Sequence, residues 1–126
     1  MFGGVDIEVL GFAVSPEKHR KITKLNSLTR ETLALLGVVA PSGLSTRLHI
    51  DDRFYGAGYA CVEPRAVAAI RRLAELEAIL LDPVYTDKAM AGLISAIETG
   101  TISSSKKILF VHTGGAPALF AYRSAI

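Results

Sequence analysis

Two short apolar runs, each ended by a turn and followed by a helix signal, constrain the fold of this chain most. The first run, residues 79–81, stops at Asp82-Pro83. The proline has no backbone donor and biases the preceding aspartate towards an extended conformation. The second run, residues 108–111, ends at a glycine turn over residues 112–115. Two such strand–turn–helix units predict a mostly parallel sheet with helices on its faces.

Both turns carry residues that could bind a ligand. Tyr85 follows the first run at the joint between strand and helix, and the Thr86 hydroxyl is a plausible N-cap of that helix. Thr113, Gly114 and Gly115 form the second turn, where the absence of side chains on the glycines admits a ligand close to the backbone. Open α/β sheets bind ligands at the carboxyl ends of their strands. We therefore expect the two turns to form one site.

The rest of the chain predicts further α/β elements. The predicted helices cover residues 16–36, 63–77 and 86–99 and begin again near residue 116; the other predicted strands cover residues 5–14 and 47–51. No repeat or linker divides the 126 residues. The sequence therefore predicts one three-layer α/β domain, residues 1–126, with strands near Val9 and Leu109 in the same parallel sheet.

Two segments of the chain resemble a known enzyme family. They are residues 81–93, LDPVYTDKAMAGL, and residues 109–122, LFVHTGGAPALFAY. Both resemble the D-cysteine desulfhydrase and 1-aminocyclopropane-1-carboxylate (ACC) deaminase family, which are pyridoxal-phosphate enzymes. The resemblance implies a partial tryptophan synthase β-like fold. It also implies that this chain corresponds to the carboxyl-terminal part of the large cofactor-binding domain.

The same resemblance implies pyridoxal phosphate as the cofactor. This cofactor draws electrons from the α-carbon bonds of an amino acid, and the group that faces its ring nitrogen tunes that effect. The chain offers the hydroxyls of Thr86 and Thr113 for this position. By resemblance, Thr113 would hydrogen-bond the ring nitrogen, and Gly114 and Gly115 would keep that side open.

The substrate implied by the resemblance is a small amino acid. Tyr59, in the glycine-spaced loop of residues 54–59, and Tyr85 would face its side chain as proton-transfer or leaving-group partners. On the residues alone, Tyr59 could equally pack under its loop, and the resemblance favours the functional interpretation. Thr86 stands where deaminases of the cyclopropane substrate have glutamate. This difference favours a β-elimination that gives pyruvate, sulfide and ammonia over cyclopropane ring opening.

The resemblance leaves part of the enzyme outside this chain. Enzymes of this family are more than twice as long, and their cofactor-binding lysine and glycine-rich phosphate loop belong to the amino-terminal part. Lys88 is expected to be solvated in the first turn of its helix. We therefore expect the chain alone to be inactive, with the amino-terminal half or a second chain as its partner. The alternatives are an ACC deaminase-like fragment and a non-catalytic α/β module for binding or oligomerisation.

Composition narrows the possible partners. Half of the residues are hydrophobic, which predicts a large exposed apolar patch and a homo-oligomer. A net charge of +2 with interspersed signs is not a nucleic-acid signature. The single cysteine, Cys61, fits a reducing cytoplasm, and no apolar run reaches the length of a bilayer. We therefore expect a cytoplasmic protein with no nucleic-acid or membrane partner.

A metal site is not expected either. His49 lies close to Asp51 and Asp52 in the sequence, and these are potential ligands. Adjacent residues of a strand point to opposite faces, so the two carboxylates would not converge on one ion. The interpretation that remains is a polar strand end.

Overall fold

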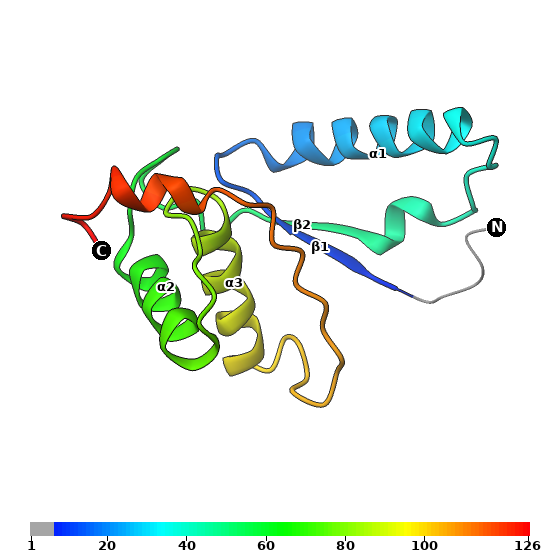
Figure 1. Cartoon of the computed structure of the whole chain (residues 1–126). Helices are drawn as coiled ribbons and strands as arrows, with labels where there is room; N and C mark the ends of the chain where they lie inside the picture. Colours follow the sequence, from blue (N-terminus) through cyan, green and yellow to red (C-terminus); the bar gives the residue numbers. More distant parts are fainter. Residues whose placement is uncertain (1–6) are drawn as a thin grey trace.

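The computed structural model describes residues 7–126. Its elements are β1 (Val9–Phe12), α1 (Lys18–Leu35), the 3-10 helix η1 (Leu44–Arg47), β2 (Leu48–Asp51), α2 (Pro64–Glu77), α3 (Thr86–Glu98) and the 3-10 helix η2 (Ala116–Phe120) (Figure 1). The three α-helices and two strands agree with the predicted positions. The first two residues of the predicted strand 5–14 lie outside the described residues.

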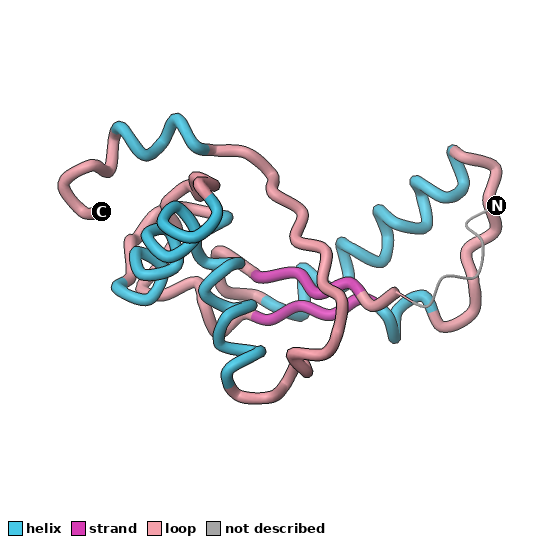
Figure 2. Tube along the Cα trace, turned by 60° about the horizontal axis from the view of Figure 1, so that its bottom comes forward, coloured by secondary structure: helices cyan, strands magenta, loops and turns pink. Residues whose placement is uncertain are grey.

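The two strands form a parallel pair. Val9 lies opposite Leu48 and Phe12 opposite Asp51, and α1 makes the crossover between them (Figure 2). Parallel neighbours need such a crossover because a short turn cannot reverse the chain twice. The α/β class with a small parallel sheet and covering helices is confirmed.

The apolar runs at residues 79–81 and 108–111 are not strands. In the described part of the chain, the sheet contains β1 and β2 alone, and residues 107–111 form an irregular segment that leads from α3 to η2 (Figure 1). Leu109 is 88% exposed. A strand exists only where a neighbour completes its hydrogen-bond ladder, and neither run has one in this structure. The prediction that strands near Val9 and Leu109 share a sheet is therefore wrong.

The predicted final helix is shorter and tighter than expected. Residues near 116 form the 3-10 helix η2 rather than an α-helix, and it begins after Gly115, whose φ of 94° is left-handed. Pro117 lies in its first turn, where a missing backbone donor costs nothing.

The core lies between α2 and α3. Ala69 and Ile70 of α2 pack against Met90 and Ala91 of α3. Leu81, in the segment between the two helices, belongs to the same cluster. A second contact ties this helical pair to the sheet, because the missing side chain of residue 92 leaves room for an aromatic ring. A Cβ on Gly92 would overlap the ring of Phe12 in β1. Helix α3 therefore packs against both α2 and β1.

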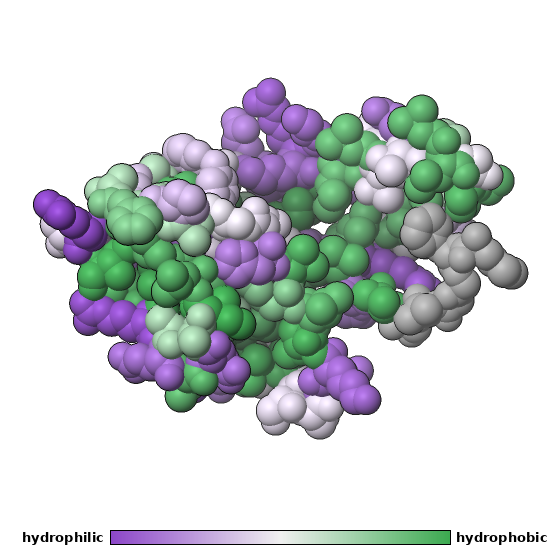
Figure 3. Space-filling view, in the orientation of Figure 1, coloured by the Kyte–Doolittle hydropathy of each residue, from purple (hydrophilic) through white to green (hydrophobic). Residues whose placement is uncertain are grey.

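Large apolar side chains remain exposed outside this core. Leu35, Val39, Leu109 and Phe120 each expose more than four fifths of their surface. Figure 3 shows hydrophobic residues gathered over the helical pair and the segment that follows it, with hydrophilic residues around them. None of the helices in the described part is both long and apolar enough to cross a bilayer.

Candidate functional site

Asp82 organises the turn that leads into α3. Its side chain is 1% exposed, and one oxygen, Oδ2, accepts the N–H groups of Val84 and Tyr85 at 2.9 Å each. The other, Oδ1, accepts the N–H of Thr86 at 2.8 Å and its hydroxyl at 2.6 Å. An aspartate before a helix can satisfy the first free N–H groups in this way. The bonds fix the backbone of Tyr85.

The prediction that Thr86 is the N-cap of α3 is wrong. Tyr85 occupies the N-cap position without a side-chain cap bond, and Thr86 is the first helical residue, 2% exposed. Sequence reasoning missed Asp82 because it treated the residue only as the neighbour of a proline. The available signal was an aspartate a few residues before the start of a helix. The first N–H groups of a helix have no partner within it, and an aspartate side chain often accepts such groups, as in an Asx turn.

The electrostatics of Asp82 follow from its partners. Burial opposes ionisation, but the hydrogen bonds from the Thr86 hydroxyl and from the backbone N–H groups outweigh it and lower the pKa of the carboxyl. Asp82 is therefore a carboxylate in the folded chain at neutral pH. Each of its two oxygens accepts two hydrogen bonds from the turn, and the side chain is buried away from solvent.

The second turn packs directly against the first. A Cβ on Gly115 would lie 2.7 Å from the Cβ of Asp82, so only glycine allows this approach. His112 contributes another link, since its Nε2 lies 2.9 Å from the carbonyl oxygen of Leu80. Its Nδ1 accepts the N–H of Gly114, so Nε2 carries the proton and donates to Leu80. The two turns therefore meet as predicted, although no strands precede them.

The two predicted tyrosines contact each other. The hydroxyls of Tyr59 and Tyr85 share a hydrogen bond, and the rings meet edge to face with centroids 5.9 Å apart. Tyr59 is 58% exposed and Tyr85 is 45% exposed, so both phenols can reach a ligand. The hydrogen bond with Tyr59 and partial burial raise the pKa of Tyr85. The Tyr85 phenol therefore stays protonated at neutral pH.

Thr113 lies exposed on the turn that Gly115 holds against Asp82. The neighbouring Gly114 has a φ of 92°, and a Cβ there would meet nothing within 4 Å. The turn thus presents a hydroxyl beside open backbone. The contacts of Thr86 are internal, since its hydroxyl also accepts the N–H of Asp82 at 2.8 Å. The cofactor roles of Thr86, Thr113 and both glycines stay predictions.

Lys88 is buried, which corrects the expectation of a solvated side chain. It has no exposed surface, and its ammonium donates to the carbonyl oxygens of Tyr55 and Gly58 at 2.9 Å each. The loop of residues 54–59 covers the first turn of α3, so these carbonyls replace water around the cation. Because its nitrogen is engaged in this way, Lys88 is not presented to a cofactor.

The adjacent Asp87 predicts a pH dependence of stability. Its side chain is fully buried, its Oδ2 has no hydrogen-bond partner in the described structure, and burial raises its pKa from 3.8 to about 6. Because the unfolded carboxyl ionises first as the pH rises, stability should fall between about pH 4 and pH 6. With solvent screening, the loss should be about 1–2 kcal/mol.

Denaturant unfolding at several pH values measures this loss. Asp87→Asn keeps an acceptor for the Lys88 N–H, which lies 2.6 Å from Oδ1. It should therefore remove this part of the pH dependence. An unchanged pH profile in Asp87→Asn would contradict the prediction.

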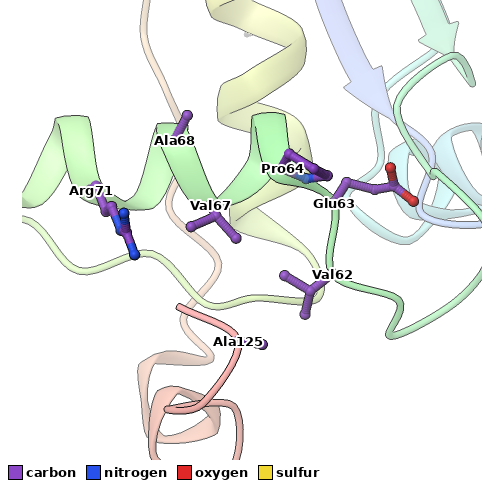
Figure 4. Close-up of a pocket in the computed structure, with 7 residues that line it drawn as sticks. All are labelled: Val62, Glu63, Pro64, Val67, Ala68, Arg71 and Ala125. Atoms are coloured by element: carbon purple, nitrogen blue, oxygen red, sulfur yellow. The ribbon is translucent and has the colours of Figure 1, made fainter.

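The hollows of the molecule lie away from these residues. The larger, of about 510 Å³, is lined by Val62, Glu63, Pro64, Val67, Ala68, Arg71 and Ala125 (Figure 4). A smaller one, of about 320 Å³, lies between α2 and α3. Neither is lined by Tyr59, Tyr85 or Thr113. The side chains of Tyr59, Tyr85 and Thr113 are exposed at the surface outside these two hollows. No group of three or more metal-ligating side chains was found among residues 7–126.

The two turns fit one end of pyridoxal phosphate. An exposed hydroxyl at Thr113 next to the open backbone of Gly114 suits the ring nitrogen and the flat face beside it. The exposed phenols of Tyr59 and Tyr85 suit the substrate side. The phosphate end and the covalent lysine have no counterpart at these turns, since Lys88 is engaged with carbonyls. The fit is thus to the ring and substrate side of the cofactor.

Comparison with known proteins gives one consistent result. Residues 6–114 match the family model described as pyridoxal-phosphate dependent enzyme. D-cysteine desulfhydrases of Salmonella newport and Salmonella agona are each 40% identical over 117 residues, which are 93% of this chain and 34% of the relative. The crystal structure of an ACC deaminase homologue superposes with a TM-score of 0.82 at 34% identity, covering 95% of this chain and 35% of that one. The chain spans about a third of the length of these relatives.

Proposed function

The chain belongs to the family of pyridoxal-phosphate dependent enzymes, and on this premise we propose that it is the carboxyl-terminal part of a D-cysteine desulfhydrase-like lyase. The observation that carries the proposal is the hydrogen bond between Tyr59 and Tyr85. It joins two exposed phenols, 26 residues apart, and Asp82, which accepts the Tyr85 N–H, packs against Gly115 in the turn of Thr113. The proposed reaction is β-elimination of hydrogen sulfide from D-cysteine, followed by hydrolysis of the unsaturated product by one water to pyruvate and ammonia.

Each residue has a role that follows from its surroundings. The cofactor, when bound, supplies the electron withdrawal that loosens bonds at the α-carbon of an amino acid. Tyr85 keeps its proton at neutral pH and can donate it to the leaving sulfur, with Tyr59 as the hydrogen-bond partner that orients the phenol. Thr113 is placed to hydrogen-bond the ring nitrogen. Asp82 binds the backbone that carries Tyr85 and touches neither cofactor nor substrate.

The chain needs a partner for this activity under the proposal. It spans 34% of the D-cysteine desulfhydrases, and the resemblance assigns the cofactor lysine and phosphate loop to the amino-terminal part. Leu109 and Val111, 88% and 70% exposed, offer apolar surface on an irregular segment that a neighbouring strand could order. We propose that the lysine-bearing part covers this surface. A second copy of the chain is the competing occupant, as in the oligomerisation alternative.

Reconstitution tests the proposal. The chain is co-expressed with the amino-terminal two thirds of a Salmonella D-cysteine desulfhydrase, and the relative's own carboxyl-terminal third serves as the positive control. Cofactor absorbance reports binding, and pyruvate release from D-cysteine reports chemistry. We expect both signals from the reconstituted pair and no turnover from the chain alone.

Two other results would redirect the assignment. Turnover of ACC in preference to D-cysteine would favour the deaminase alternative, which the likeness to the ACC deaminase homologue supports. Sedimentation that shows self-association of the chain, with no complex and no turnover, would favour the oligomerisation module. A working positive control is required before either negative result counts.

A further inference from the structure

The loop that carries Tyr59 is held by two side chains of opposite charge. Lys88 lies beneath it and donates to the carbonyl oxygens of Tyr55 and Gly58. Glu63 contacts the same loop, and its Oε1 accepts the N–H of Ala57 at 3.0 Å. The Lys88 cation thus binds carbonyl oxygens, which carry partial negative charge, and the Glu63 carboxylate binds an N–H, which carries partial positive charge.

The fit of the loop to Glu63 is close. Gly56 has a φ of 69°, and a Cβ there would overlap the Glu63 side chain. Figure 4 shows the Glu63 carboxylate pointing away from Val62 and Val67 of the neighbouring cavity. The side chain is therefore directed to the loop, where its bond to Ala57 is made, and not into the hollow that it borders.

Lys88 occupies a position that a cation does not favour on its own. It lies in the first turn of α3, near the positive end of the helix dipole, and it is fully buried. An ammonium in such a place is stabilised only by the oxygens around it, here two loop carbonyls, together with the charge of the adjacent Asp87. The loop and the cation therefore depend on each other.

We propose that Lys88 and Glu63 are positioning residues that hold the backbone of residues 55–58 and thereby place the Tyr59 hydroxyl against that of Tyr85. The carbonyl of Gly58 immediately precedes Tyr59, so fixing it fixes the start of the tyrosine backbone. Without these two side chains, the loop would keep the buried ring of Phe54 and the bond from the Cys61 N–H to the Gly58 carbonyl oxygen, but residues 55–57, with Gly56 among them, would lose their bonds to Lys88 and Glu63. The inference rests on the proposed function only for the use made of Tyr59.

The test measures the distance between the two rings in the chain itself, with no cofactor or substrate. Tyrosines are isotope-labelled, and the NMR cross-peak between the rings of Tyr59 and Tyr85 is followed. The cross-peak between Phe12 and Phe54, whose centroids are 6.0 Å apart, reports that the fold is intact. Lys88→Met removes the ammonium at similar volume but leaves the buried Asp87 without its neighbouring cation, so the phenylalanine cross-peak must first show that the variant is folded. We expect at least a threefold loss of the tyrosine cross-peak with the phenylalanine cross-peak unchanged.

Glu63 supplies the second arm and its matched control. Glu63→Ala should weaken the same cross-peak, whereas Glu63→Gln should keep it because the amide oxygen still accepts the Ala57 N–H. This pair decides the question if Lys88→Met does not fold. A tyrosine cross-peak of wild-type intensity in folded Lys88→Met or in Glu63→Ala would overturn the proposal, as would equal loss in both Glu63 variants. These cross-peaks are measured without cofactor or substrate, so a reconstituted pair that does not turn over D-cysteine leaves them unchanged. Failure of the proposed function is therefore distinguishable from failure of this inference.

Discussion

Asp82→Ala is expected to lower the free energy of unfolding of this chain by about 3–5 kcal/mol. The substitution removes the acceptor of three backbone N–H groups and of the Thr86 hydroxyl, all at the buried entry to α3. Each buried donor left without a partner costs about 1 kcal/mol or more. The bonds from Val84 and Thr86 are buried and that from Tyr85 is partly buried, so most of the lost bonds are not replaced by water. Denaturant unfolding followed by circular dichroism measures the loss.

Two comparisons make this expectation specific. Asp82→Asn keeps one acceptor oxygen and the volume of the side chain, so its loss should be smaller than that of alanine. Glu75→Ala, on the exposed face of α2, should change stability by less than about 0.5 kcal/mol. An Asp82→Ala variant as stable as Glu75→Ala would show that the turn is held by other contacts.

The pH dependence gives an independent check on the sign. The hydrogen bonds lower the pKa of Asp82, so its stabilisation is present above the ordinary pKa of 3.8 and disappears as the pH falls through the lower value in the folded chain. The difference in stability between wild type and Asp82→Asn should therefore shrink in acid. Asp87 acts in the opposite direction, since its raised pKa makes the folded chain less stable as the pH rises towards 6.

The sequence predicted local elements better than their pairing. The prediction of α2 rests on Pro64 and that of α3 on the break at Asp82-Pro83, and both predicted helices begin and end within a residue or two of the observed ones. The apolar runs at 79–81 and 108–111 have the composition of strands, yet they are not strands in this structure. Whether an apolar run becomes a strand depends on a neighbour elsewhere in space, and composition does not contain that information.

In the candidate site, too, features set by nearby residues were easier to predict than features set by distant segments of the chain. The meeting of the two turns follows from Gly115 beside Asp82, and the pair of Tyr59 and Tyr85 follows the resemblance. The burial of Lys88 could not be read from its helix position, because it depends on a loop 30 residues earlier folding over it. Long-range contacts of this kind leave no periodic signal in the residues themselves.

Tyr85→Phe is expected to slow pyruvate release by about 10²–10⁴-fold in the reconstituted enzyme, the range typical of one general acid or base. The substitution removes the phenol proton and the hydrogen bond to Tyr59, and it leaves the ring in its edge-to-face contact. Cofactor absorbance should be unchanged, because the proposed contacts to the cofactor ring come from the turn of Thr113. The paired measurement therefore separates binding from chemistry.

Two further variants place this effect in context. Tyr122→Phe removes a phenol whose hydroxyl donates to the carbonyl oxygen of Ala60, the residue after Tyr59, at 3.4 Å rather than to either phenol of the pair, and should leave turnover near the wild-type rate. Thr113→Ala should cost about 1 kcal/mol, or roughly fivefold to tenfold in rate, since one neutral hydrogen bond is lost. If Tyr85→Phe turned over D-cysteine as fast as Tyr122→Phe, the phenol would have no part in the elimination. The contact with Tyr59 would then serve packing of the loop, and the proton for the leaving sulfur would have to come from a group on the lysine-bearing part.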